Sequence, residues 1–226
     1  MQLVIGNKNY SSWSMRPWVL LKQAGIAFDE HKIRFDAFTP ESSFKTELAR
    51  VTPTGRVPVL IDGDLTVWDT LAIAEYVAEK FPAKQLWPQE TKARARARSV
   101  CAEMHAGFGA IRNQFPMNIE ASLPEVGQRL LASDAGVRAD VDRIIEMWSG
   151  LLAAHGGPLL FGDFTIADAY FAPVVMRFRT YGVPVPPAVA GYVARVVELP
   201  GVAAWIREAL AERDFLDFEE PYRSQA

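Results

Sequence analysis

The chain has 226 residues, of which 50% are hydrophobic and 23% are charged, and its formal net charge is −3. This length is sufficient for one or two domains with a buried core, and the composition is that of an ordinary globular protein. A nucleic-acid-binding protein would show a basic patch. The arginines Arg94, Arg96 and Arg98 alternate with alanines, so on a helix they spread around a solvated surface. We therefore expect no nucleic-acid partner.

Cysteine content and hydropathy indicate the compartment. The single cysteine, Cys101, leaves no intrachain disulfide, which is typical of a reducing compartment. No apolar run approaches the ~18 residues of a membrane span, and the sequence opens on a strand-like segment instead of a secretory signal. His31, His105 and His155 lack metal-ligand spacing. We expect a cytoplasmic protein with no membrane contact and no metal.

The first 81 residues predict alternating strands and helices. Strands are predicted at 3–5, at 28–35, within 52–61 and at 65–68. A first helix is predicted to include the amphipathic run 18–23, and further helices are predicted over 41–50 and 70–81. Gly25 ends the first helix, and Asp62-Gly63-Asp64 is a hairpin turn signal. A parallel crossover therefore comes first and an antiparallel hairpin second. This order predicts a thioredoxin-like α/β domain.

The stretch from Ser11 to Trp18 joins the first strand to the first helix. A helix start carries N–H groups without intrahelical partners and a partial positive charge, so it favours an anion. Ser14 is predicted as the N-cap, with Pro17 tolerated in the first turn because its missing N–H costs little there. Ser11 and Ser12 then lie on a loop facing a pocket. We expect this loop to bind a thiolate supplied by a substrate.

Two further positions suit a peptide ligand. Pro58 lies inside a strand-like segment, where proline removes a ladder donor. A cis Val57–Pro58 bond would leave the Val57 backbone open to a ligand, and a trans proline on an edge strand is the alternative. Asp69 and Thr70 begin the next helix, where they cap it or receive the ammonium and carboxylate groups of a ligand. These two functions are compatible at one helix start.

Together these positions resemble the active-site residues of the cytosolic glutathione transferases. The resemblance covers nearly the whole chain, and the residues that carry it are Ser11-Ser12-Trp13-Ser14-Met15-Arg16, Val57-Pro58 and Asp69-Thr70-Leu71-Ala72-Ile73-Ala74-Glu75-Tyr76. The serine motif is similar to that of the zeta class. Its Ser11-x-x-Ser14 frame takes the place of the Cys-x-x-Cys of thioredoxin and of omega-class relatives.

What the resemblance implies for catalysis concerns the two serines. Ser11 would hold the glutathione sulfur, with Ser12 as its neighbour or substitute. Trp13 stands where the zeta pattern has a cysteine, which argues against maleylacetoacetate isomerase activity. Serine at position 11 also argues against disulfide exchange through the protein, because a hydroxyl cannot form a mixed disulfide.

The resemblance also implies a set of glutathione contacts. Val57 would pair with the cysteinyl backbone, and Asp69 with Thr70 would hold the γ-glutamyl end. Arg56 or Lys45 would meet the glycyl carboxylate. The implied glutathione-binding residues are Trp13, Lys45, Arg56, Val57, Pro58, Asp69 and Thr70.

From residue 82 the pattern becomes helical. Residues 82–90, which include two prolines, read as a linker between a domain of residues 1–81 and an all-helical domain of residues 91–226. Helices are predicted over 91–115, 135–154, 169–178, 187–199 and 202–212. Thr165 to Asp168 forms a capping-box pattern ahead of the apolar third helix. Asp168 is therefore interpreted as structural instead of catalytic.

The electrophile pocket is expected between the two domains, facing Ser11. Its predicted walls are Met104, His105, Phe108 and Arg112, and further candidates are Trp13, Ile111, Phe115, Phe164 and Phe171. Most of these residues equally suit the core. Apolar and aromatic walls suit a hydrophobic second substrate.

The sequence thus predicts a glutathione transferase that uses glutathione as co-substrate and a small hydrophobic electrophile. Dimerisation is expected from the resemblance. Two alternatives remain open: a glutathione-dependent isomerase of the maleylacetoacetate or maleylpyruvate type, and a non-catalytic binding or scaffold protein with the same fold.

Overall fold

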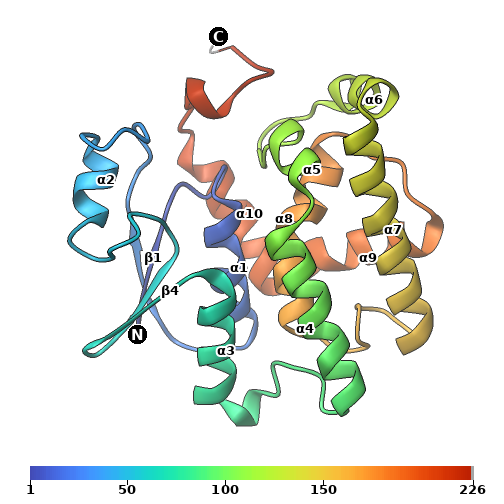
Figure 1. Ribbon diagram of the computed structural model, residues 1–226, viewed down its shortest axis with the longest axis horizontal. Coiled ribbons are helices and arrows are strands. Elements are labelled where there is room, and N and C mark those ends of the chain that lie inside the picture. Colours follow the sequence, from blue (N-terminus) through green and yellow to red (C-terminus); the bar gives the residue numbers. More distant parts are fainter. Residues whose placement is uncertain (225–226) are drawn as a thin grey trace.

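The structure is a computed structural model that describes residues 1–224. An α/β N-terminal domain and a helical C-terminal domain lie side by side (Figure 1). The N-terminal elements are β1 (Gln2–Ile5), α1 (Ser12–Gln23), β2 (Asp29–Lys32), α2 (Ser43–Leu48), β3 (Val59–Asp62), β4 (Leu65–Trp68) and α3 (Thr70–Lys80). A 3₁₀ turn, Pro82–Lys84, follows α3 and leads toward the helical domain.

The four strands form one mixed sheet in the order β2-β1-β3-β4. β1 runs parallel to β2, whereas β3 runs antiparallel to both β1 and β4. Val4 of β1 pairs with His31 on one side and with Val59 on the other. This arrangement confirms the predicted thioredoxin-like order. β2 is shorter than predicted, because its ladder to β1 ends at Lys32.

Side chains alternate along each strand, so they point to both faces of the sheet, and both faces are covered. Leu3 and Ile5 belong to the main hydrophobic core together with residues of α1 and α3. Val4 points to the other face and packs in a second cluster with Phe44 and Leu48 of α2. Figure 1 accordingly shows α1 and α3 between the sheet and the helical domain, with α2 on the far side. The start of α1 is thereby placed at the boundary between the domains.

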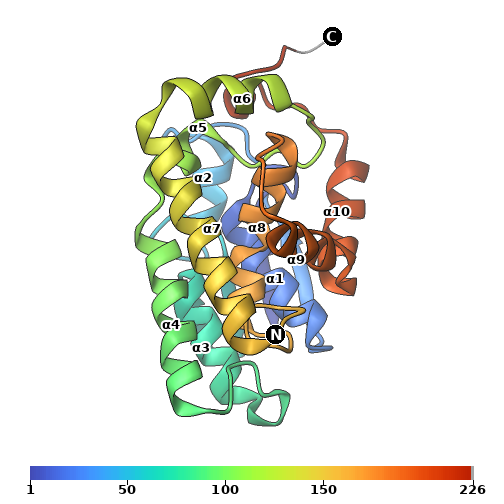
Figure 2. The same cartoon turned by 90° about the vertical axis from the view of Figure 1, so that its right-hand side faces the viewer.

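The helical domain is built around a buried central helix. Its elements are α4 (Thr91–Ala106), α5 (Gly109–Gln114), α6 (Pro124–Ser133), α7 (Ala135–His155), α8 (Ile166–Thr180), α9 (Pro187–Glu198), α10 (Pro200–Glu212) and a 3₁₀ turn (Asp217–Glu219). Almost every residue of α8 is buried, and α8 packs on α1, α4 and α9. Figure 2 shows α8 behind α7 and α4, close to α1.

The start of α8 carries the capping box expected from the sequence. Asp168 is fully buried, and its carboxyl oxygens accept hydrogen bonds from the N–H groups of Leu160 (3.1 Å) and Thr165 (2.9 Å). Burial raises the pKa of the Asp168 carboxyl to about 6. These contacts confirm the structural interpretation of Asp168.

Two helices differ from the sequence prediction. The single helix predicted over 91–115 is two helices, because Gly107 ends α4 and Phe108 takes a left-handed conformation with φ 55°. α6 has no counterpart among the predicted helices. Its apolar residues Val126, Leu130 and Leu131 are only partly buried.

The segment after α10 returns to the loop that precedes α1. The Tyr10 hydroxyl donates to the Glu220 carboxylate (2.8 Å), and Asn118 Nδ2 donates to the same carboxylate (2.8 Å). Phe218 contacts Phe38 edge-on, with ring centroids 5.3 Å apart. The C-terminal 3₁₀ turn is therefore held over the boundary between the domains.

Within residues 1–224, no single helix has the length and apolar composition to cross a bilayer, and α9 and α10 meet both criteria only when taken together across a 70° bend.

Candidate functional site

The start of α1 brings together hydroxyl and backbone groups. Ser11 is the N-cap: its Oγ accepts from the Ser14 N–H (3.4 Å), and the helix begins at Ser12. Ser14 Oγ accepts from the Gly6 N–H (3.1 Å) and lies 2.7 Å from Ser11 Oγ. The prediction of Ser14 as N-cap is wrong, because the helix begins earlier in the chain. For the same reason Pro17 lies inside the helix instead of in its first turn.

The Ser11 hydroxyl can donate a hydrogen bond to a ligand. Ser11 Oγ donates to Ser14 Oγ, which also accepts from the Gly6 N–H. Because hydroxyl hydrogens rotate, the Ser11 hydroxyl can turn from Ser14 toward a ligand. The Ser11 hydrogen is then available to an acceptor beyond it. Ser11 is only 6% exposed, so a hydrogen bond from Ser11 to an anion would form away from bulk water, where it is stronger.

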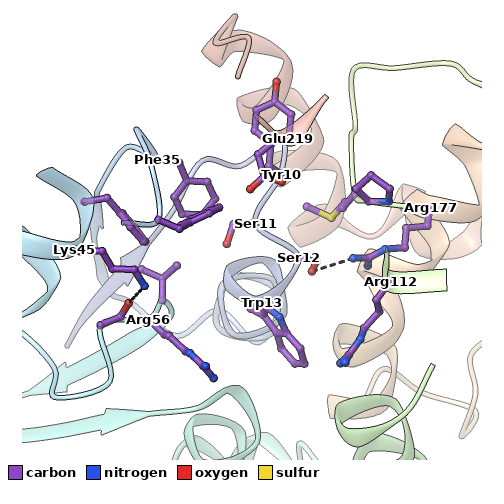
Figure 3. A pocket seen from close by; sticks show the side chains of 16 residues that line it. Tyr10, Ser11, Ser12, Trp13, Phe35, Lys45, Arg56, Arg112, Arg177 and Glu219 are labelled. Carbon is purple, nitrogen blue, oxygen red and sulfur yellow. Dashed lines mark hydrogen bonds between the residues drawn. The ribbon is translucent and has the colours of Figure 1, made fainter. Parts of the chain in front are cut away.

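Ser11 and Ser12 line a cavity of about 400 Å³, which we call the serine cavity. Its walls come from both domains and from the C-terminal 3₁₀ turn (Figure 3). The lining residues are Tyr10, Ser11, Ser12, Trp13, Phe35, Phe38, Phe44, Lys45, Gly55, Arg56, Val57, Arg112, Pro116, Met117, Arg177 and Glu219. Among the described lining residues, the cationic side chains are Lys45, Arg56, Arg112 and Arg177, whereas Glu219 is the single carboxyl group. The cavity favours an anionic ligand.

Arg177 of α8 places a buried cation in this wall. The side chain is 4% exposed, its Nε donates to the Phe115 carbonyl (2.8 Å), and its Nη2 donates to Ser12 Oγ (3.2 Å). Within residues 1–224 its Nη1 has no hydrogen-bond partner. Burial, aided by Arg16 and Arg112, lowers the pKa of Arg177 to about 9, so it remains charged at neutral pH. Arg177 therefore places a buried positive charge beside Ser12, which favours an anion in the serine cavity.

Trp13 separates two further arginines. The Arg16 guanidinium lies 4.3 Å from its ring centroid and that of Arg112 lies 5.5 Å away, which are cation–π distances. Arg16 is buried and donates to the carbonyls of Ser12 (3.1 Å) and Tyr170 (3.0 Å). These contacts fix the indole between the two domains.

A second cavity of about 440 Å³ adjoins the first, and we call it the Asp69 cavity. The two cavities share Trp13, Arg56, Val57 and Arg112 as walls. The remaining walls of the Asp69 cavity are Thr54, Pro58, Trp68, Asp69, Thr70 and His105. The Val57–Pro58 bond is cis, as predicted. Because Val57 lines both the serine cavity and the Asp69 cavity, one ligand can extend past it from one cavity into the other.

Asp69 caps α3, which confirms one of its two predicted functions. One carboxylate oxygen accepts from the N–H groups of Leu71 (2.8 Å) and Ala72 (3.4 Å). The other oxygen lies 3.3 Å from His105 Nε2. Asp69 takes φ 75°, an uncommon conformation for a residue other than glycine, and such strain is often found at ligand sites.

Tyr170 of α8 connects the helical domain to this helix start. Its hydroxyl lies 2.8 Å from Thr70 Oγ1 and 2.8 Å from His105 Nδ1. Burial raises the pKa of the Tyr170 phenol to about 12, so the hydroxyl keeps its proton at neutral pH. Thr70 is buried and its hydroxyl is already paired with Tyr170. A ligand carboxylate here would therefore lie at a helix start whose Leu71 and Ala72 N–H groups already donate to Asp69.

The two predicted glycyl-end cations also lie at the serine cavity. Lys45 Nζ donates to the Gly55 carbonyl (2.8 Å), which ties α2 to the loop before β3. Arg56 follows on that loop, is exposed and lines both cavities.

The predicted electrophile-pocket residues are divided between cavity and core. Arg112 lines both cavities, and His105 lines the Asp69 cavity beside Asp69. Met104 and Phe108 are instead buried in the core at 0% and 7% exposure, which corrects their assignment to the pocket. Met104 is buried because α4 packs on α8, whereas Phe108 lies in the turn between α4 and α5 and packs in the same core. Ile111, Phe115 and Phe171 are likewise fully buried, and Phe164 packs partly buried against the core.

The residues of the site that were not identified from the sequence include Tyr170, Arg177 and Glu219. Arg177 lies 165 positions after the serine that it contacts. One sequence signal was available, because a charged residue inside the long apolar run of α8 must find a partner when buried. Glu219 lies in a polar C-terminal stretch without a comparable signal.

Comparison with known proteins agrees with this geometry. The model of the glutathione S-transferase N-terminal domain matches residues 10–80, and that of the C-terminal domain matches residues 89–208. The chain is 28% identical over 183 residues to glutathione S-transferase 1 of Dianthus caryophyllus, covering 80% of this chain and 78% of the relative. It is 26% identical over 178 residues to a stringent starvation protein A homologue of Coxiella burnetii, covering 76% and 74%.

A solved structure gives the same result. A glutathione transferase homologue from Burkholderia gl BGR1, crystallised with bound glutathione, superimposes with a TM-score of 0.70 at 26% identity, covering 93% of this chain and 98% of the other. The family models together span both domains, including the serine loop, the Asp69 helix start and α8. The chain therefore belongs to the glutathione S-transferase family.

Proposed function

We propose that this protein is a glutathione transferase in which Ser11 stabilises the glutathione thiolate and directs it onto an electrophile in the serine cavity. The observation that carries the proposal is the Ser11 hydroxyl at the start of α1, which is hydrogen-bonded to Ser14 Oγ, itself the acceptor of the Gly6 N–H. The glutathione bound to the Burkholderia relative supports it.

The energies of these groups are sufficient to ionise a thiol. A free thiol has a pKa near ~8.5, and lowering it by roughly 2 units needs about 2.7 kcal/mol. A hydrogen bond to a charged group contributes roughly 1.5–3 kcal/mol, and a helix start adds roughly 0.3–1. The buried Arg177 cation stabilises the anion further. One serine hydroxyl at this helix start thus makes the thiolate accessible near neutral pH, without a general base.

Glutathione would lie across both cavities. Its sulfur faces Ser11, its cysteinyl backbone pairs with Val57, and its γ-glutamyl end lies at Asp69 and the α3 N–H groups. The wall that Val57 shares between the cavities supports this placement. The glycyl carboxylate then meets Lys45 or Arg56, with Trp13 and Pro58 lining the path.

The second substrate would occupy the rest of the serine cavity. Aromatic side chains from α2 and the loop before it supply an apolar wall, whereas Arg112 and Arg177 supply positive charge. This combination favours an electrophile with an apolar body and a negatively charged group.

The two arginines also favour a second candidate function, glutathione-dependent isomerisation of a maleyl-type substrate. The thiolate would add to the double bond, the new single bond would rotate, and glutathione would leave unchanged. Trp13, in the position of the zeta-class cysteine, argues against maleylacetoacetate as the substrate. Isomerisation regenerates glutathione, so consumption of glutathione distinguishes the two candidates.

The test combines binding and turnover. We expect retention on immobilised glutathione and conjugation of a generic aryl halide, with the Ser11→Ala variant strongly impaired in conjugation. Retention without turnover of any electrophile would instead favour a binding or scaffold role. Full conjugation activity in Ser11→Ala would remove Ser11 from the role proposed here.

We also propose that the protein acts as a homodimer in the cytoplasm, as the family resemblance implies. Light scattering coupled to size-exclusion chromatography tests the dimer, and fractionation of cells that express the protein tests the location.

A further inference from the structure

Glu219 is the carboxyl group of the serine cavity, and the thiolate chemistry does not use it. It lies in the C-terminal 3₁₀ turn and lines the cavity together with Ser11 and Ser12. Figure 3 shows Glu219 above Ser11, with Arg177 and Arg112 to the right of the cavity. A carboxyl at this position meets whatever binds beside the sulfur.

The neighbouring Glu220 is fully paired, whereas Glu219 is not. Glu220 accepts from the Tyr10 hydroxyl and from Asn118 Nδ2, each at 2.8 Å, and its Oε1 lies 3.6 Å from Arg223. Glu219 is half-buried, and within residues 1–224 no side chain or backbone N–H hydrogen-bonds its carboxyl group. Glu220 thus anchors the turn and leaves the Glu219 carboxyl directed to the cavity.

The turn is held firmly enough to position an acid. The Leu216 N–H donates to the Tyr10 hydroxyl (3.3 Å), and the Glu219 N–H donates to the Leu216 carbonyl (2.8 Å). Phe218 packs edge-on against Phe38 on the α2 side. The backbone at Glu219 is therefore fixed from the α1 loop and from the segment before α2.

The surroundings of Glu219 favour its protonated form. Burial, followed by the adjacent Glu220 charge, raises the pKa of the Glu219 carboxyl to about 7. The other charged or titratable groups that line the cavity are Tyr10, Lys45, Arg56, Arg112 and Arg177. A general acid works best when its pKa lies near the working pH.

We propose that Glu219 is the general acid for the addition of glutathione to activated alkenes, meaning alkenes conjugated to a carbonyl group. This inference rests on the proposed function and names a substrate class for the same cavity. It makes Glu219 a catalytic residue, because its proton goes to the reacting carbon framework.

The step balances as follows. The thiol proton leaves to solvent when the thiolate forms at Ser11. The sulfur lone pair then forms a C–S bond to the β-carbon, and the alkene π electrons move to the α-carbon and carbonyl oxygen as an enolate. Glu219 gives its proton to the α-carbon of the enolate, a C–H bond forms, and the Glu219 carboxylate regains a proton from water. Substitution on an aryl halide expels halide instead and needs no proton on carbon.

The test compares these two reactions in one enzyme. The variant is Glu219→Gln, which keeps the shape but cannot donate a proton, and the control is Asp217→Asn in the same turn, whose side chain is exposed. General acid catalysis typically contributes 10²–10⁴-fold, so the ratio of enone turnover to aryl-halide turnover should fall about 100-fold in Glu219→Gln. It should be unchanged in Asp217→Asn.

The pH dependence gives a second readout. In the wild type, the enone rate should bend downward above about pH 7 as Glu219 loses its proton, while the aryl-halide rate rises with thiolate. Glu219→Gln should lack this descending limb, and Glu219→Asp should retain it.

The outcomes separate this proposal from the proposed function. If both rates change equally in Glu219→Gln, or if the wild type conjugates aryl halides but not enones, the assignment of Glu219 is overturned while the transferase function stands. If the wild type does not bind glutathione, the proposed function fails and the Glu219 assignment fails with it. Faster enone turnover in Glu219→Gln would show that the carboxyl only offsets the arginines, which also overturns the proposal.

Discussion

Replacing Ser11 by alanine tests the proposed origin of the thiolate. The hydroxyl lies 2.7 Å from Ser14 Oγ and is 6% exposed, so no water readily replaces it. Removing its hydrogen bond to a charged sulfur costs roughly 1.5–3 kcal/mol. At 1.36 kcal/mol per unit, this raises the pKa of the bound thiol by roughly 1–2 units.

The rate should follow the thiolate fraction. At a pH below both thiol pKa values, Ser11→Ala should conjugate an aryl halide roughly 10- to 100-fold more slowly at saturating glutathione. At a pH above both values the thiol is ionised in either enzyme, so the two rates should converge. The assay is a pH–rate profile for each enzyme, together with titration of the thiolate absorbance of the bound glutathione.

Ser11 also caps α1, so a stability control is needed. Losing an N-cap typically costs about 1 kcal/mol of folding free energy, and the long 3.4 Å cap contact places Ser11 at the lower end. Asp134, the N-cap of α7, accepts from Gly136 (2.8 Å) and Val137 (3.0 Å) and lies outside both cavities. Asp134→Ala should lower stability without moving the thiol pKa.

Two results would refute the reasoning. One is a Ser11→Ala profile that overlays the wild type at low pH. The other is a thiol pKa shift that occurs in Ser12→Ala instead, which would assign the sulfur to the hydroxyl paired with Arg177.

Two further predictions concern the helical domain. Tyr170→Phe removes the hydroxyl that contacts Thr70. Loss of a hydrogen bond of about 1 kcal/mol should weaken glutathione affinity, measured by calorimetry, about 5- to 10-fold. Unchanged affinity would mean that Thr70 is positioned without the Tyr170 hydroxyl. Asp168→Ala leaves the N–H groups of Leu160 and Thr165 unpaired and should destabilise the fold by about 3 kcal/mol in denaturant unfolding, without changing the thiol pKa. Burial raises the pKa of Asp168 to about 6 in the folded protein, so protonation of Asp168 stabilises the wild type below about pH 4. This contribution is lost as the pH rises through about 6. The destabilisation caused by Asp168→Ala should therefore be largest in acid. A destabilisation that grows with pH would contradict this assignment.

Local sequence patterns determined the order of the elements in the N-terminal domain and the starts of α3 and α8. The alternation of Leu3, Val4 and Ile5 and the Asp62-Gly63-Asp64 turn predict the strands, because strand periodicity and turn chemistry act over a few residues. The caps at Asp69 and Thr165 are local as well, since a capping side chain bonds N–H groups two or three positions along.

Because these patterns act over a few residues, they did not predict the break between α4 and α5 or the burial of Met104 and Phe108. Helix periodicity identifies which residues share a face, but it does not say which neighbour that face meets. Packing of α4 on α8 buries Met104, and the left-handed Phe108 turns the chain so that Arg112 reaches the cavities.

Only the tertiary structure decided what surrounds the serines. Arg177, Tyr170 and Glu219 come from distant parts of the chain, and each acquires its function through burial beside a partner that no short pattern specifies. The charge, pKa and exposure of such groups depend on how much water the fold removes from them. The sequence by itself therefore determined the strand, loop and helix that carry Ser11 and Ser12, whereas the packing of α8 and the C-terminal turn determined the cation and the carboxyl group that line the same cavity.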